Sequence, residues 1–132
     1  MTMVRTTILA VLAIGWFSAA AAQAGEQAQQ QGSFVVNNPT DSKIAYDVKW
    51  GPAGEWKQYT LEPGERRCHY HALTVHGTVP TPRLRYDCDL APGKIEMKEF
   101  EPQTRATIDP WRGTSYTFRS ASGGRFAYLY ED

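Results

Sequence analysis

The densest group of chemically versatile side chains is a short run near the middle of the chain, Cys68-His69-Tyr70-His71, followed by His76. In a β-strand, side chains two positions apart point to the same face, so His69 and His71 are suited to chelating zinc or copper together. His76, in the adjoining loop, would supply a third nitrogen. The alternative interpretation is a pair of surface histidines without a metal, because structural zinc sites usually show four ligands in a recognisable spacing.

The two cysteines, Cys68 and Cys88, are predicted to form a structural disulfide. Both cysteines fall at the apolar positions of segments in which apolar and polar residues alternate. The N-terminus has the form of a signal peptide, and an exported chain meets oxidising conditions that favour disulfides. If their strands pair antiparallel with Cys68 opposite Cys88, then Tyr70 lies opposite Tyr86, and one register aligns both pairs. A bridge of this loop length would stabilise the domain by about 3 kcal/mol in the chain-entropy model. A metal site using both thiolates is the competing interpretation.

Groups suited to catalysis are scarce in this sequence. The serines fall at expected strand ends or in turns, and no G-x-S-x-G motif occurs. Glu99 and Glu101 lie close to Lys94 and Lys98 along one expected strand, as in a solvated face with cross-strand ion pairs. We therefore expect a protein that is not an enzyme and that has no cofactor, with zinc or copper as the alternative.

The tryptophans indicate a binding surface more directly. Trp56 follows the break at residues 51–54, and Trp111 lies in a Pro-to-Gly turn at residues 110–113. Both are candidates for an exposed platform that stacks on a sugar or a peptide. The alternative is that Trp50 fills the centre of the core while Trp56 and Trp111 cover its open ends, as aromatic residues often do in small domains.

The elements that must position these residues all read as strands. Residues 43–50 alternate, with Ile44, Tyr46, Val48 and Trp50 on one face, and residues 83–89 alternate in the same way. Turn residues at 37–41 predict a hairpin between a strand at 34–36 and the strand at 43–50, and the chain should close with a hairpin of 114–119 and 125–131. The pattern predicts an all-β fold, a seven- to eight-stranded antiparallel β-sandwich.

The N-terminus has the form of a signal peptide. Arg5 precedes an apolar run from Ile8 to Phe17, and Ala22-Gln23-Ala24 fits a cleavage site. The run is well short of the roughly 20 residues needed to span a bilayer, so we expect no stable membrane insertion after cleavage. We predict a signal peptide at 1–24, a flexible leader at 25–32, a β-sandwich domain at 33–132, and a secreted or periplasmic location.

Charge narrows the range of partners. The chain has 14 Lys and Arg against 14 Asp and Glu, and removal of residues 1–24 takes away only Arg5 among them. A nearly neutral domain lacks the electrostatic footprint of a nucleic-acid binder. We expect no nucleic acid among the partners, and a protein, a peptide or a glycan instead.

One stretch resembles a known family. Asn37-Asn38 at the end of an early strand, the strand from Ile44 to Trp50, and the runs Tyr59-Thr60-Leu61-Glu62-Pro63-Gly64 and Arg66-Arg67-Cys68-His69 follow one another. In this order they resemble the β domain of the von Hippel–Lindau family, a seven-stranded sandwich that binds an extended hydroxyproline-bearing peptide. The resemblance implies that Tyr59 and His69 match two members of that pocket, whereas the family's serine falls at Tyr70. The chain also looks like small secreted bacterial proteins that have a glutamine-rich leader and one β domain.

These observations predict a secreted or periplasmic binding module without enzymatic activity. The expected binding residues are Trp56, Tyr59, His69, His71 and Trp111. One alternative is an envelope protein that binds zinc or copper through His69, His71 and His76. The other is a purely structural envelope protein without a ligand.

Overall fold

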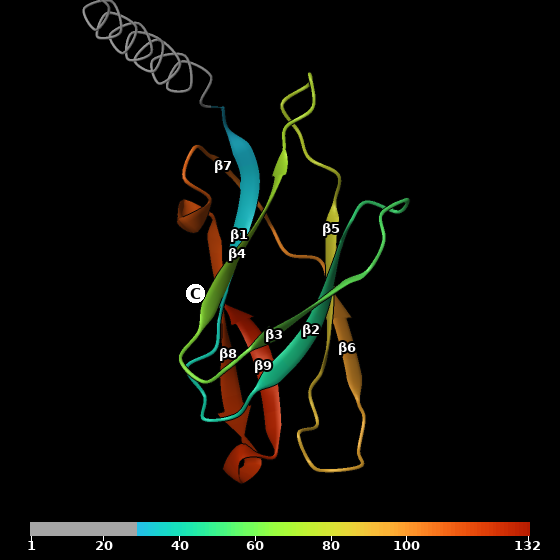
Figure 1. Ribbon diagram of the computed structural model, residues 1–132, viewed down its shortest axis with the longest axis vertical. Helices are drawn as coiled ribbons and strands as arrows, with labels where there is room; N and C mark the ends of the chain where they lie inside the picture. Colours follow the sequence, from blue (N-terminus) through green and yellow to red (C-terminus); the bar gives the residue numbers. More distant parts are fainter. Residues whose placement is uncertain (1–28) are drawn as a thin grey trace, which may run out of the picture.

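The computed structural model describes residues 29–132, which fold into nine strands arranged in two sheets (Figure 1). The predicted signal peptide at 1–24 lies outside the described residues. The strands are β1 (Gln31–Asn37), β2 (Ile44–Trp50), β3 (Lys57–Leu61), β4 (Arg66–Ala72), β5 (Pro82–Asp87), β6 (Met97–Phe100), β7 (Arg105–Thr107), β8 (Thr114–Ala121) and β9 (Phe126–Glu131). Two short 3-10 turns, η1 (Pro110–Arg112) and η2 (Ser122–Gly124), flank β8.

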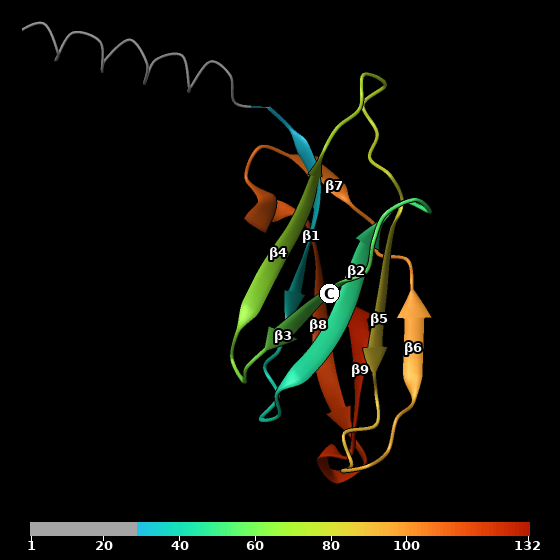
Figure 2. The ribbon, with the colours of Figure 1, turned by 45° about the vertical axis from the view of Figure 1, so that its right-hand side comes forward.

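The two sheets pack face to face, as predicted for a β-sandwich. One sheet has the order β3-β2-β5-β6, and the other has the order β4-β1-β8-β9 with β7 added beside β1. Figure 2 shows the four-stranded sheet lying in front of the five-stranded sheet. All strand pairs are antiparallel except β1 and β8, which run parallel. The predicted antiparallel architecture thus contains one parallel pair within residues 29–132.

The core lies between the sheets and follows the alternation of the sequence. Ile44, Tyr46 and Val48 from β2 and Leu84 and Tyr86 from β5 are buried, as the pattern of two predicts. The facing sheet contributes a second set of buried residues, Phe34, Val36, Tyr116, Phe118 and Ala127. The burial of these apolar side chains against one another stabilises the sandwich.

The turn at residues 37–41 forms a corner between the sheets, and the predicted hairpin of the first two strands is wrong. β1 pairs with β4, β7 and β8, whereas β2 pairs with β3 and β5. Asn38 is buried at this corner, and its side-chain amide donates to the carbonyls of Ser42 and Leu61 at 2.8 and 3.1 Å. These bonds satisfy the buried amide and hold the chain as it passes from one sheet to the other.

The predicted disulfide is also wrong, because both cysteines are free thiols. Cys68 on β4 lies opposite Val35 of β1, and Tyr86 lies opposite Tyr46, so β4 and β5 belong to different sheets. Cys88 is fully buried in the core, whereas Cys68 points to the outer side of its sheet because its neighbour His69 points inward. The two thiols therefore lie on opposite faces of the five-stranded sheet.

The C-terminal hairpin forms where the sequence predicts it. β8 and β9 pair in the register Phe118 to Leu129, and the turn between them contains Gly123 and Gly124 with positive φ. Glycine tolerates this conformation without a steric penalty, which explains the tight reversal. Within residues 29–132, no helix has the length and apolar character that a membrane crossing requires.

Candidate functional site

His69 is the centre of a group of rings at the side of the sandwich where β3 and β4 lie. Its side chain points inward from β4 and is 5% exposed. It stacks on Phe34 with ring centroids 5.0 Å apart and meets Tyr59 edge-on at 4.6 Å. We call this group the aromatic–histidine cluster; its members are Phe34, Tyr46, Trp50, Tyr59, His69 and His71.

The buried histidine is held by one polar partner. The Tyr46 hydroxyl and His69 Nε2 lie 2.7 Å apart and form a hydrogen bond inside the core. The pKa of His69 is lowered to about 3, first because a charged imidazolium is costly away from water and second because of the nearby Arg67 guanidinium. Burial also raises the pKa of Tyr46. At neutral pH both side chains are therefore uncharged.

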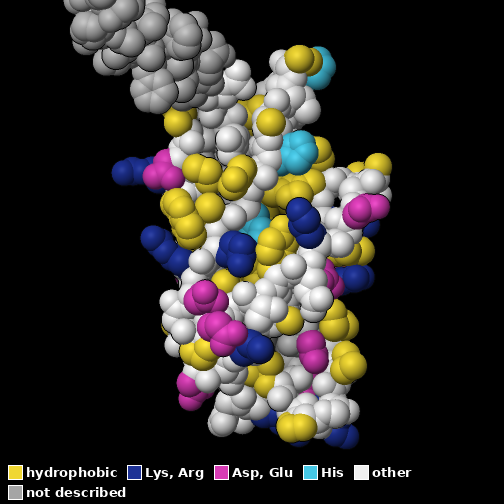
Figure 3. Space-filling model, in the orientation of Figure 1, with side chains coloured by type: hydrophobic (Ala, Val, Ile, Leu, Met, Phe, Trp, Pro, Cys, Tyr) yellow, Lys and Arg dark blue, Asp and Glu magenta, His cyan; other side chains and the backbone are white. Residues whose placement is uncertain are grey.

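Three members of the cluster reach the surface. Tyr59, Trp50 and His71 are half-buried, and the rings of Trp50 and His71 lie 5.4 Å apart. The Arg67 guanidinium lies 5.2 Å from the centre of the Tyr59 ring. Figure 3 shows this face, on which histidine side chains lie among hydrophobic ones with basic side chains beside them. The surface therefore offers ring faces and edges together with a cation.

β4 itself is an edge strand. It occupies the end of its sheet and pairs only with β1 within residues 29–132. An edge strand presents unpaired backbone N–H and C=O groups, which can hydrogen-bond to another extended chain. The exposed cluster members thus lie beside a row of free backbone groups.

Trp56 lies apart from the cluster. Its ring is approached by Arg85 at 4.1 Å and by Lys49 at 5.0 Å. Both basic residues alternate with the buried Val48 and Leu84, so they lie on the outer face of the four-stranded sheet. The structure therefore does not bring Trp56 together with Tyr59 and His69.

Trp111 and His76 are separate as well. Trp111 lies in η1 on the outer side of the five-stranded sheet, where the Arg66 guanidinium is 4.6 Å from its ring centre. His76 is exposed in the loop between β4 and β5. Within residues 29–132 no group of three or more metal-binding side chains occurs. His69 and His71 share a face as predicted, but that face is the inner one, and His69 Nε2 is already bonded to Tyr46.

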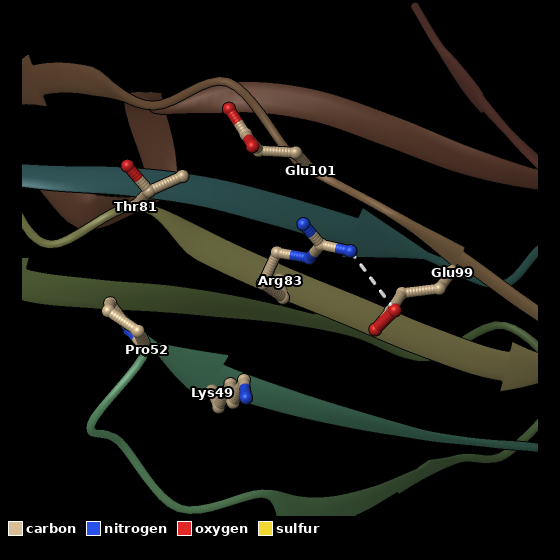
Figure 4. Close-up of a pocket in the computed structure, with 7 residues that line it drawn as sticks. Lys49, Pro52, Thr81, Arg83, Glu99 and Glu101 are labelled. Atoms are coloured by element: carbon tan, nitrogen blue, oxygen red, sulfur yellow. Dashed lines mark hydrogen bonds and ion pairs between the residues drawn. The ribbon is translucent and has the colours of Figure 1, made fainter.

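A pocket of about 390 Å³ opens on the outer face of the four-stranded sheet (Figure 4). Its charged lining residues are Lys49 of β2, Arg83 of β5, Glu99 of β6 and Glu101 just beyond β6. Arg83 Nη2 and Glu99 Oε2 form an ion pair at 3.0 Å, which the dashed line in Figure 4 marks. The rest of the lining is Gly51, Pro52 and Thr81.

Sequence reasoning missed several of these residues. The alternation of residues 43–50 places Tyr46 and Trp50 on the buried face, which was a usable signal for their place beside a core histidine. The pocket could not be seen in the sequence, because its residues come from three strands whose neighbourhood is a matter of topology. Comparison of the chain with protein families, with curated proteins and with solved structures finds no match.

Proposed function

We propose that this protein is a non-enzymatic binding module that takes an extended peptide segment along β4, with side chains of the peptide resting on the aromatic–histidine cluster. The observation on which this depends is the position of Tyr59, Trp50 and His71, which are partly exposed beside the edge strand. An extended chain that adds to a sheet edge gains main-chain hydrogen bonds, and pockets for alternate side chains provide specificity. A free strand edge and partly exposed aromatic rings occur together here on one side of the sandwich.

The resemblance to the von Hippel–Lindau β domain supports the same surface. The two residues that match the family's peptide pocket, Tyr59 and His69, have ring centroids 4.6 Å apart. Tyr70, which stands where that family has a serine, points away from the cluster and is 53% exposed. A ligand of this protein therefore meets a tyrosine where the family has a serine, and the family's hydroxyproline-bearing peptide is not the proposed ligand.

The reactive side chains support binding more than catalysis. Burial raises the pKa of the thiols of Cys68 and Cys88, so both are protonated at neutral pH and are weak nucleophiles. The pKa of His69 is near 3, far from the range in which a general base operates best. We also propose that the protein acts after export, in the periplasm or outside the cell, because residues 1–24 have the pattern of a signal peptide.

An array of random ten-residue peptides, probed with the full chain, tests the proposal. We expect a set of peptides whose capture is lost in Tyr59→Ala and kept in the matched variant Trp111→Ala, since Trp111 lies on another face. Failure to capture any peptide in a Tyr59-dependent manner contradicts the proposal and favours a purely structural protein. A rise in melting temperature with zinc or copper that is lost in His71→Ala would instead favour the metal interpretation.

A further inference from the structure

The pocket on the four-stranded sheet has a row of charges across three neighbouring chain segments. Lys49 of β2 lies opposite Arg83 of β5, and Glu101 follows Phe100, which lies opposite Leu84. One further step in that antiparallel register places Glu101 beside Arg83. The row therefore runs from Lys49 through Arg83 to Glu101, and all three side chains line the same pocket.

Of the three charged side chains in this row, only Arg83 has an oppositely charged partner in the described part of the domain. Arg83 is paired with Glu99 at 3.0 Å. Within residues 29–132, neither Lys49 nor Glu101 forms an ion pair. Lys49, whose ammonium lies 5.0 Å from the centre of the Trp56 ring, and Glu101 thus have no oppositely charged partner among the described residues, and they stand on opposite sides of the pocket (Figure 4). Like charges directly opposite on a sheet are unfavourable, so Lys49 beside Arg83 would gain from a ligand anion.

The size of the row limits the ligand. Neighbouring strands lie about 4.8 Å apart, so the backbones of Lys49 and Glu101, two strand spacings apart, are separated by about 10 Å. An extended tripeptide has a similar length, at about 3.3 Å per residue. A pocket of about 390 Å³ falls within the range of small-molecule sites. Dipeptides and tripeptides come closer to this length than a single amino acid does.

We propose that this pocket binds short peptides with free ends, two or three residues long, with the carboxylate toward Lys49 and the ammonium toward Glu101. The four charged residues of the lining sum to zero, which favours a zwitterion over a strongly anionic or cationic ligand. The Arg83–Glu99 ion pair, Thr81 and Pro52 also line the pocket. This site is distinct from the aromatic–histidine cluster and takes a different ligand.

A titration of the ¹⁵N-labelled full chain with triglycine, followed by amide chemical shifts, tests the proposal. We expect saturable shifts at the pocket residues and none at Tyr59 and His69 of the aromatic–histidine cluster. N-acetyl-triglycine lacks the ammonium and triglycine amide lacks the carboxylate, so each should bind about two- to fivefold more weakly, as exposed charge pairs allow. Maltotriose, a neutral sugar of comparable size, should cause no shifts.

Charge-removing variants assign the two ends of the ligand. In Lys49→Met the amide and the free acid should bind equally, and in Glu101→Gln the acetylated and free peptides should bind equally. Lys43→Met and Glu131→Gln, which make the same changes outside the pocket lining, should keep both preferences. The proposal is overturned if triglycine causes no saturable shifts, if the blocked peptides bind as well as triglycine, or if maltotriose binds in its place. A null result here leaves the Tyr59-dependent capture of extended peptides unaffected, so the two failures are distinguishable.

Discussion

The buried histidine makes the stability of the domain depend on pH. Its pKa is about 3 in the folded protein and about 6.5 in the unfolded chain. Between these values the unfolded state binds a proton that the folded state does not, so the free energy of unfolding rises with pH in this window and falls on acidification. From pH 7 to pH 5 the loss attributable to His69 is about 2 kcal/mol, because each pKa unit corresponds to about 1.4 kcal/mol.

Urea unfolding at pH 7 and pH 5, followed by tryptophan fluorescence, measures this loss. The matched variant is Tyr46→Phe/His69→Phe, which removes both partners of the buried hydrogen bond and leaves neither unsatisfied. The parent should lose about 2 kcal/mol more than the double variant, equivalent to a fall in melting temperature of about 10 °C. Groups that titrate in both proteins contribute equally, so they cancel in this difference. His76→Ala, a change at an exposed histidine, should lose as much unfolding free energy between pH 7 and pH 5 as the parent does.

An equal loss of stability in the parent and the double variant would refute the reasoning. If the double variant does not fold, the imidazole signals of the parent answer the same question by NMR. His69 should keep the spectrum of a neutral ring at pH 5, and a charged His69 at that pH contradicts the assigned burial.

Three further outcomes follow from the fold. Phe118→Ala should lower the free energy of unfolding by about 3–5 kcal/mol in urea titrations, because Phe118 is fully buried among aromatic rings; a loss below 1 kcal/mol would show that the ring is not in the core. Gly113→Ala should destabilise by about 1–3 kcal/mol, measured as a lower melting temperature, since a Cβ there meets side-chain and backbone atoms of Ser33; an unchanged melting temperature argues against this close approach. Alkylation of the unfolded, unreduced chain should modify both Cys68 and Cys88, as mass spectrometry can show, and a protected pair would restore the disulfide.

The fold class could be predicted because strand alternation is a local property. Ile44, Tyr46 and Val48 repeat with a period of two, and so do Leu84, Tyr86 and Cys88, and all six are buried. The final hairpin could be predicted for a similar reason, since its two strands adjoin one glycine-rich turn. Neither inference needed information about distant parts of the chain.

The orientation of β4 could not be predicted from hydropathy. Because Cys68 and Tyr70 are more apolar than the histidines, the alternation predicts that they face the core and that His69 faces solvent. The structure instead buries His69 and exposes Tyr70. A neutral imidazole is tolerated in the core because the Tyr46 hydroxyl, on a strand of the other sheet, satisfies it. The partner that makes this burial favourable is 23 residues away in the sequence.

The sequence by itself determined the kind of elements, their approximate bounds and the inward faces of β2 and β5. Only the tertiary structure decided which strands are neighbours, because pairing depends on long-range contacts that alternation does not encode. Because of this strand pairing, Cys68 lies apart from Cys88, and Trp56 and Trp111 lie apart from Tyr59. The same pairing places His69 among the aromatic rings of the core. It also aligned Lys49, Arg83 and Glu101 in one pocket, which is a property of three chain segments and of none of them alone.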